Sequence, residues 1–164
     1  MRAMSHIYSL DTLFRMTYDL KKQGRRIGIT HGAFDLFHAS HFDLLQKSSQ
    51  LCDFLIVGVD SNRNVSAYKS YLRPIIKQVD RLKIVNELSC VDAVFVNNLA
   101  LKPEAFTKLY RELNIDIVTI GQHFAFEDQV NEQAEHAKAK LFKLHTRQYP
   151  TTSDIIHTIA SRYS

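Results

Sequence analysis

Apolar residues follow two spacings along this chain. Runs of about five to eight mostly apolar residues, typical of buried strands, alternate with stretches in which apolar residues recur every three or four positions, as in helices. The run 53–60 (DFLIVGVD) is the clearest strand, since it is apolar almost throughout. Strands are predicted at 26–31, 53–60, 92–96, 115–120 and 140–145. Helices are predicted at 10–22, 40–51, 78–89, 103–113, 128–138 and 152–162.

This order of elements predicts an α/β fold. We expect a Rossmann-like, doubly wound parallel sheet of about five strands with helices on both faces. No repeat, low-complexity tract or Pro/Gly-rich linker divides the chain, so one domain is expected over 1–164. Ligands of such sheets bind beyond the carboxyl ends of the strands, where the strand order reverses. Residues 32–41, directly after the first strand, are therefore the first candidate for a site.

Composition narrows the class of protein. The chain is 45% hydrophobic and 23% charged, as in ordinary globular proteins. It lacks both the apolar run of about 18 residues that a membrane span needs and a recognisable signal peptide. Cys52 and Cys90 form no metal or redox motif and are expected to be reduced core thiols. We therefore expect a cytoplasmic protein without a membrane partner.

The chain is mildly basic. It has 21 Lys and Arg against 17 Asp and Glu, a net charge of +4. This excess either steers an anionic substrate or is only scattered surface charge. No Arg-rich tract with interleaved aromatic residues is present, so we expect no nucleic-acid partner.

The segment 32–41 reads GAFDLFHASH and contains two histidines three residues apart, His38 and His41. At this spacing two imidazoles share one face at the start of a helix. There they can hold a polyphosphate together with the helix N-terminal amides. Two other interpretations remain open for the pair alone: two solvated histidines, or a metal pair, although no further ligands follow at a zinc spacing.

The surrounding pattern resembles the nucleotidylyltransferase superfamily of the cytidylyltransferase type. Its pattern is a strand followed by G-x-F-D-x-x-H-x-G-H, and residues 32–41 match every fixed position except the last Gly, which is Ser40 here. Later segments resemble the nucleotidyl-transfer domain of ADP-heptose synthases, and glycerol-3-phosphate cytidylyltransferases share much of the plan. These segments are VGVDSN at 57–62, Lys69, RP at 73–74, DR at 80–81, VD at 91–92, IDIVTIG at 115–121 and TTSDII at 151–156. The similarity covers about 26–159.

The resemblance implies transfer of a nucleoside monophosphate from ATP or CTP to a small phosphorylated acceptor, with release of pyrophosphate. A sugar or polyol phosphate, such as heptose 1-phosphate or glycerol 3-phosphate, is the implied acceptor. The resemblance also implies Mg²⁺ or another divalent cation with the nucleotide, no organic cofactor, and a homodimer. Positioning and positive charge around the phosphates are what such a reaction requires from a protein.

The same resemblance assigns roles to residues of this chain. His38, His41 and Lys69 would hold the triphosphate and stabilise the transition state. The nucleotide-binding residues would be Thr30, Gly32, Ala33, Phe34, Ser40, Arg81, Gly121, Thr151, Thr152 and Ser153. His31, Asp35 and His123 would lie near the acceptor.

Several of these residues also have a purely structural interpretation. Thr152 and Ser153 are good helix caps, and Arg81 fits a structural ion pair as well as a nucleotide contact. Phe34 fits core packing. Asp35 is expected to tie its loop to backbone N–H groups rather than to bind a metal.

Two departures from the family pattern favour an alternative function. Ser40 adds a Cβ and a hydroxyl where the family has Gly, which is harmful if the position needs a positive φ or a close approach to the nucleotide. After Gly121 the chain reads Gln122-His123-Phe124, where heptose-type enzymes usually have an acidic residue. The alternative is a catalytically weakened nucleotide-binding or regulatory module of the same fold. A pantetheine-phosphate adenylyltransferase is also possible, although the spacing from Lys69 to Arg81 favours the cytidylyltransferase type.

Overall fold

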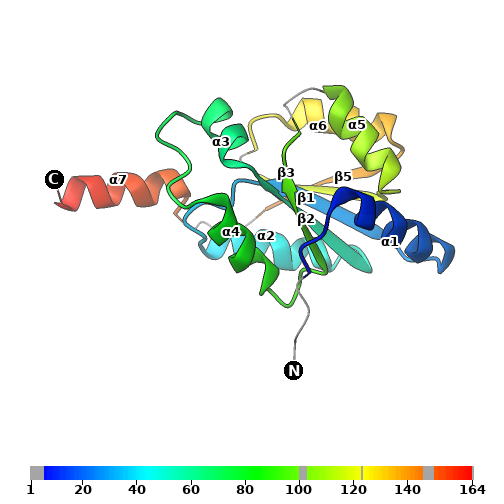
Figure 1. Cartoon of the computed structure of the whole chain (residues 1–164). Coiled ribbons are helices and arrows are strands. Elements are labelled where there is room, and N and C mark those ends of the chain that lie inside the picture. The colour runs from blue at the N-terminus through cyan, green and yellow to red at the C-terminus, as the bar shows by residue number, and fades with distance from the viewer. Residues whose placement is uncertain (1–5, 100–102, 123, 146–149, 164) are drawn as a thin grey trace.

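The computed structural model describes residues 6–99, 103–122, 124–145 and 150–163. Within this part of the chain, five parallel strands form one sheet in the order β3-β2-β1-β4-β5 (Figure 1). The strands are β1 (Ile27–Gly32), β2 (Phe54–Asp60), β3 (Ala93–Asn97), β4 (Ile117–Gly121) and β5 (Lys140–Leu144). The helices are α1 (Leu10–Lys22), α2 (Ala39–Ser49), α3 (Asn62–Tyr68), α4 (Gln78–Asn86), α5 (Pro103–Glu112), α6 (Glu127–His136) and α7 (Thr152–Tyr163). The predicted doubly wound α/β fold is therefore confirmed.

Helices cover both faces of the sheet, as the apolar strands require. Alternate side chains of a strand point to opposite faces. Ile27 and Ile29 of β1 therefore pack with α1, α5 and α6 in one buried cluster, which also contains Leu13 and Tyr110. Leu55, Val57 and Val59 of β2 pack against the other face with Leu45 of α2 and Leu82 of α4. Neither face of the central strands is left to solvent.

The predicted helices and strands are all present, and one short helix was not predicted. This helix is α3, which has seven residues and directly follows β2. Its start is marked in the sequence by Ser61, whose side chain accepts a hydrogen bond from the backbone N–H of Asn64 at 3.2 Å. Periodicity did not reveal α3 because two turns are too short to establish an apolar stripe.

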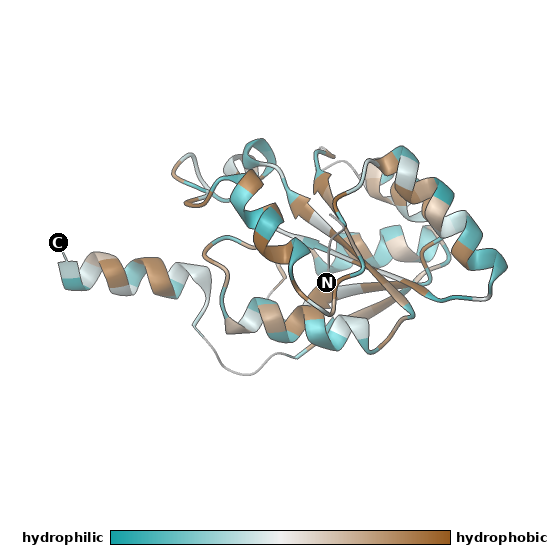
Figure 2. Cartoon of the chain, turned by 60° about the horizontal axis from the view of Figure 1, so that its bottom comes forward, coloured by the Kyte–Doolittle hydropathy of each residue, from teal (hydrophilic) through white to brown (hydrophobic). Residues whose placement is uncertain are grey.

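The strand order places a reversal between β1 and β4. From β1 the chain passes outward to β2 and β3, and it then returns to the other side of β1 with β4 and β5. The carboxyl ends of β1 and β4 thus form the switch point at which doubly wound sheets bind ligands. Helix α7 starts near this edge and extends away from the sheet (Figures 1 and 2), with no buried residue along its length.

None of the helices in the described ranges has the combination of length and apolar character that crossing a lipid bilayer requires.

Candidate active site

A cavity of about 510 Å³ lies at the carboxyl edge of the sheet. Its walls come from the segment after β1, the ends of β2 and β3, the end of α3, the segment after β4, and the start of α7. Of the predicted site residues, it brings together His31, Gly32, Ala33, Phe34, Asp35, His38, Ser40, His41, Lys69, Gly121, Thr151, Thr152 and Ser153. Thr30 and Arg81 are not in its lining, and His123 lies outside the described residues.

The loop between β1 and α2 is held by the carboxylate of Asp35. This side chain is fully buried, and it accepts hydrogen bonds from the backbone N–H groups of Ile75 and Ile76, both at 2.9 Å. Arg73 Nε adds an ion pair at 2.8 Å. Burial alone would raise the pKa of Asp35, but these hydrogen bonds and the Arg73 charge hold the pKa below its ordinary value. The predicted tie to backbone N–H groups is confirmed, and it joins the loop to residues 73–76.

The two histidines of the motif stack on one another beside the cavity. His38 precedes α2, His41 lies in its first turn, and their ring centroids are 3.9 Å apart. Burial lowers the pKa of His38. Burial and the neighbouring His38 ring lower the pKa of His41 to about 3. Both rings are therefore neutral near pH 7, because burial disfavours the charged form. Two imidazolium ions at this separation would also repel one another.

Only some of the ring nitrogens of this pair are available to a ligand. The Nδ1 atoms of His38 and His41 are buried and have no hydrogen-bond partner among the described residues. His38 Nε2 lies 3.3 Å from Thr152 Oγ1. A neutral imidazole carries one N–H, so the position of that hydrogen decides which nitrogen can donate to a phosphate.

The start of α7 reaches the histidine pair. Thr152 Oγ1 donates to the carbonyl of Asp35 at 3.0 Å, which fixes the start of α7 against the β1–α2 loop. Thr151 and Asp154 form a local cap: the carboxylate of Asp154 accepts from both the N–H and the hydroxyl of Thr151 at 2.8 Å. These hydrogen bonds lower the pKa of Asp154. The cap is thus made by Thr151, one residue before the predicted caps Thr152 and Ser153, and Ser153 stays exposed.

A buried polar network closes the cavity on the side of β2 and β3. Asp60 and Asn97 are paired residues at the ends of these strands. Asn97 Nδ2 donates to one carboxylate oxygen of Asp60, and the hydroxyl of Tyr68 donates to the other, both at 2.7 Å. Burial and the Asp60 charge raise the pKa of Tyr68, so its hydroxyl keeps its proton. This network holds the end of α3, and with it Lys69, at the edge of the cavity.

Lys69 is the exposed cation of the cavity. It is the C-terminal cap residue of α3, and its Nζ lies 5.6 Å from the centroid of the Tyr68 ring. Within the described ranges no carboxylate pairs with it. Its ammonium group is therefore free to meet an anion that enters the cavity.

Aromatic rings line the cavity on the side of β4. His31 stacks on Phe106 with ring centroids 4.7 Å apart, and Phe124 meets it edge-on at 6.1 Å. His31 Nε2 lies 3.1 Å from the hydroxyl of Tyr110. Burial lowers the pKa of His31, partly opposed by the Asp60 charge, so this ring is neutral as well. A Cβ on Gly121 would meet no atom within 4 Å, so there is open space beside this residue at the end of β4.

A family model described as cytidylyltransferase-like matches residues 29–159, which is well over half of the chain. The chain belongs to the cytidylyltransferase-like family. The matched range includes the histidine pair, Lys69 and the start of α7.

Curated relatives support the assignment over most of the chain. The bifunctional protein HldE of Methylobacillus flagellatus is 32% identical over 157 residues, which covers 94% of this chain and 31% of the relative. The HldE protein of Helicobacter pylori strain G27 is 37% identical over 131 residues, which covers 75% of this chain and 28% of the relative. This chain therefore spans about a third or less of the length of these relatives.

Solved structures share the fold at low sequence identity. A lipopolysaccharide core biosynthesis protein from Thermoplasma volcanium has a TM-score of 0.62 and 23% identity, covering 77% of this chain and all of that chain. A pantoate-beta-alanine ligase from Francisella tularensis has a TM-score of 0.65 and 15% identity, covering 95% of this chain and 79% of that chain. Both agree with the doubly wound sheet.

Ser40, the departure from the cytidylyltransferase-like pattern, occupies a position that suits an L-residue. It is the second residue of α2 and is not among the non-glycine residues with positive φ. The backbone therefore does not require glycine at this point. No hydrogen-bond partner for its hydroxyl is found among the described residues, and the residue lines the cavity. The serine thus adds a hydroxyl donor beside the histidine pair without backbone strain.

The side chains of three predicted site residues are engaged inside the protein. Arg81 is 1% exposed, and its guanidinium donates to the carbonyl groups of Ile76, Ala33 and Asp60. Thr30 is fully buried, and its hydroxyl donates to the carbonyl of Thr119 at 2.9 Å. The carboxylate of Asp35 is engaged by Arg73 and by the backbone N–H groups of Ile75 and Ile76. In each case the polar group is consumed inside the protein, so it is not available to a ligand.

The sequence interpretation missed Asp60, Tyr68, Arg73 and Asn97 as parts of the cavity. A signal existed for two of them. Asp60 and Asn97 each end an apolar strand, and the carboxyl ends of parallel strands meet at one edge of the sheet. Arg73 lies in the RP segment at 73–74 that carries the family resemblance, but no role was assigned to it. Tyr68 carried no comparable signal, because its position depends on the path of α3.

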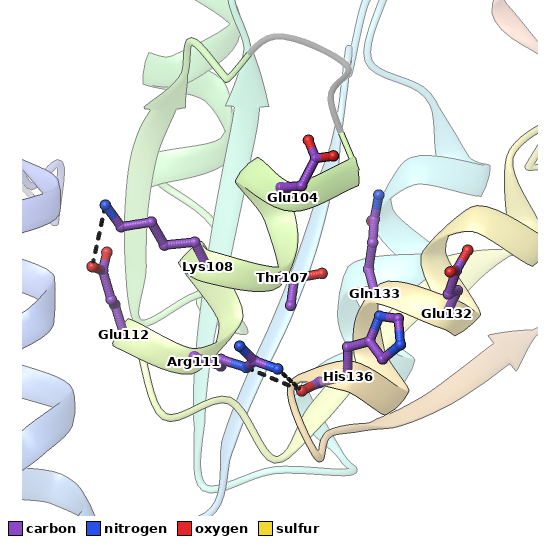
Figure 3. Close-up of a pocket in the computed structure, with 8 residues that line it drawn as sticks. All are labelled: Glu104, Thr107, Lys108, Arg111, Glu112, Glu132, Gln133 and His136. Carbon is purple, nitrogen blue, oxygen red and sulfur yellow. Dashed lines mark hydrogen bonds and ion pairs between the residues drawn. The ribbon is translucent and has the colours of Figure 1, made fainter.

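A second hollow, of about 870 Å³, lies between α5 and α6 and shares no lining residue with the cavity (Figure 3). Its cations are already engaged: Arg111 donates twice to the carbonyl of His136, and Lys108 lies 3.7 Å from Glu112. Glu104 and Glu132 add two further carboxylates. This charge pattern disfavours a polyphosphate, so the smaller cavity at the switch point is the candidate site.

Proposed function

We propose that this protein transfers a nucleoside monophosphate from ATP or CTP to a small phosphorylated acceptor, with release of pyrophosphate. The observation that carries the proposal is the stacked, neutral pair of His38 and His41, placed at the switch point between the start of α7 and Lys69. Membership of the cytidylyltransferase-like family supports the reaction class.

The proposed reaction is an in-line displacement at the α-phosphorus. A phosphate oxygen of the acceptor forms a new P–O bond, and the P–O bond between the α- and β-phosphates breaks. The leaving pyrophosphate takes the electron pair. The chain does not need to supply a nucleophile, so its contribution is position and charge stabilisation around the phosphate oxygens.

The described residues match these needs. Neutral imidazoles donate an N–H to a developing oxyanion without holding a charge that would bind the ground state equally well. Lys69 adds a cation at the rim of the cavity. The start of α7 lines the cavity, and the N-terminus of a helix favours an anion.

A divalent cation is best placed on the substrate in this proposal. No set of three or more His, Cys, Asp or Glu in the described ranges is arranged to hold an ion. The carboxylates of Asp35 and Asp60 are engaged in hydrogen bonds. These residues do not fit a resident metal centre, and we derive no step through one. We propose that Mg²⁺ arrives as the counter-ion of the triphosphate, where the phosphate oxygens and water are its ligands.

We further propose a sugar or polyol phosphate as the acceptor, on the basis of the resemblance to ADP-heptose synthases and glycerol-3-phosphate cytidylyltransferases. The aromatic side of the cavity, with the neutral His31, is the proposed location of the acceptor's non-phosphate part. The choice between ATP and CTP, the homodimer and the cytoplasmic location stay predictions.

The test is a matrix of nucleoside triphosphates against phosphorylated acceptors, with pyrophosphate release as the readout. We expect turnover for at least one pair, dependent on a divalent cation and abolished in His38→Gln. His136→Gln is the matched control, because that side chain is exposed and lies outside the cavity. Circular dichroism of each variant separates loss of chemistry from loss of fold.

The alternative is a nucleotide-binding module that has lost efficient chemistry. It predicts triphosphate binding by calorimetry without turnover for any acceptor, and recovery of turnover in Ser40→Gly. The helical backbone at Ser40 favours the active enzyme over this alternative. Absence of both binding and turnover in a folded protein would refute both functions.

A further inference from the structure

The hydroxyl of Thr152 connects α7 to the histidine pair through two hydrogen bonds. Its oxygen lies 3.0 Å from the carbonyl oxygen of Asp35 and 3.3 Å from Nε2 of His38. A carbonyl only accepts, so both contacts are hydrogen bonds only if the single hydroxyl hydrogen of Thr152 is directed to Asp35. This leaves Thr152 Oγ1 as an acceptor toward His38.

The tautomer of His38 follows from the direction of this hydroxyl hydrogen. Because the hydrogen of Thr152 is directed to Asp35, Thr152 Oγ1 can only accept from His38, and His38 Nε2 therefore carries a hydrogen and donates it. Burial lowers the pKa of His38, so its ring is neutral near pH 7 and Nδ1 is bare. Nδ1 is buried and has no hydrogen-bond partner among the described residues, so no contact there opposes this assignment.

The same contact determines the rotation of the ring. A half-turn about the bond from Cβ to the imidazole would place Cε1 opposite Thr152 in place of Nε2, and the hydrogen bond would be lost. A histidine without a partner populates both tautomers and both rotations. Only the rotation and tautomer selected by Thr152 present an N–H donor at this edge of the ring.

We infer that Thr152 is a positioning residue, which holds His38 as the Nε2–H tautomer so that this N–H is ready to donate to the phosphate being transferred. In the free protein the N–H donates to Thr152, and on substrate binding it donates to a phosphate oxygen. Thr152 acts through His38 in this scheme, whereas the family resemblance implied direct contact with phosphate.

This role also explains how α7 influences the site. Thr152 is the first residue of α7, and no side chain of that helix is buried. Thr152 hydrogen-bonds both the carbonyl of Asp35 in the β1–α2 loop and the ring of His38. Correct orientation of His38 therefore depends on the start of α7 being in place.

The first test does not require turnover. Long-range ¹H–¹⁵N spectra of the folded protein at pH 7.5 report which ring nitrogen of His38 carries hydrogen, with His38→Gln identifying the signals. We expect a protonated Nε2 and a bare Nδ1 in the wild type and in Thr152→Ser. We expect averaged signals of two tautomers in Thr152→Val, which keeps the shape of threonine but removes the hydroxyl. A protonated Nδ1 in the wild type would overturn the inference.

The second test rests on the proposed function and uses the active pair of substrates. Partners that orient a functional histidine are typically worth about tenfold to a hundredfold, and we expect Thr152→Val to lower kcat by this factor. KM for the triphosphate should change less than about twofold, since binding contacts are retained. Thr152→Ser should recover kcat, and Thr158→Val, exposed on the same helix, should match the wild type.

The two tests separate the possible failures. If Thr152 bound the phosphate directly, KM would rise in Thr152→Val while the tautomer of His38 stayed the same, and the inference would be wrong. If no substrate pair turned over, the spectra would still decide the role of Thr152, and only the proposed function would fail.

Discussion

Replacement of Arg81 by methionine tests whether this residue is structural. Its buried guanidinium donates to the carbonyl of Ile76 at 2.9 Å, to that of Asp60 at 2.8 Å, and to that of Ala33. A further hydrogen bond reaches Asn62 Oδ1 at 3.1 Å. Methionine replaces the aliphatic stem of arginine but ends at the position of Nε and has no donor, so Arg81→Met leaves these carbonyl groups without a partner inside the protein.

The expected cost can be worked from these contacts. Each buried acceptor left unsatisfied costs about 1–3 kcal/mol. Part of this total cost is offset, because the variant no longer buries a charge. Breaking a buried charge network typically costs about 3–5 kcal/mol. We therefore expect the free energy of unfolding to fall by about 3–5 kcal/mol, a large part of the roughly 5–15 kcal/mol that stabilises a typical domain. At about 2–4 °C per kcal/mol, Tm should fall by roughly 6–20 °C.

The measurement is urea unfolding of Arg81→Met, Arg81→Lys and the wild type. Lysine keeps the charge but lacks the planar fork of donors, so it should recover only part of the loss. Arg63→Met is the control, because Arg63 is exposed on α3, and we expect a change within about 0.5 kcal/mol. The reasoning would be refuted if Arg81→Met kept its stability within about 1 kcal/mol and only lost affinity for the triphosphate.

Three further predictions concern packing, pH and charge. In Gly58→Ala the new Cβ would lie 2.8 Å from the ring of Phe95, so we expect the free energy of unfolding, measured in urea, to fall by about 1–3 kcal/mol. Gly121→Ala is the control, because a Cβ there would meet no atom within 4 Å, and we expect no change. The pKa of His41 is about 3 in the folded protein and 6.5 in the unfolded chain, so on acidification the unfolded state takes up the proton first. The free energy of unfolding should therefore fall by roughly 1–2 kcal/mol between pH 7 and pH 5. His41→Gln should make this pH dependence shallower, and an equal slope in both proteins would contradict the lowered pKa of His41. Lys69→Ala should lower kcat/KM by about tenfold or more, with partial recovery in Lys69→Arg, and unchanged kinetics would remove Lys69 from the site.

Much of the fold was predictable because it depends on local patterns. The apolar run of β2 and the helical spacing of residues 10–22 both correspond to elements of the structure. The motif at 32–41 also predicted the position of the histidine pair, because a segment that follows the first strand of a doubly wound sheet reaches the switch point.

The sequence could not decide those roles that depend on what surrounds a residue. Arg81, Thr30 and Asp35 are polar and lie in or near family motifs. Both a ligand contact and a structural contact were compatible with the sequence for Arg81 and Asp35, and a ligand contact was predicted for Thr30. In the folded chain each is paired with groups distant in sequence, such as Thr119 for Thr30. The partners of a buried polar group are set by the packing of several elements, which no local pattern contains.

From the sequence alone, the five strands, the helices other than α3, the sheet type and the place of the histidine pair after the first strand could be predicted, since they follow from the spacing of apolar residues and from one contiguous motif. Which polar groups remain open to a ligand depended on the folded chain. Folding turned Arg81 inward, gave Ser40 a helical backbone, and placed Thr152 within hydrogen-bond distance of His38 across more than a hundred residues of chain. A hydrogen bond forms between groups that meet in space, and the positions of α2, α4 and the start of α7 at the edge of the sheet determine which groups meet.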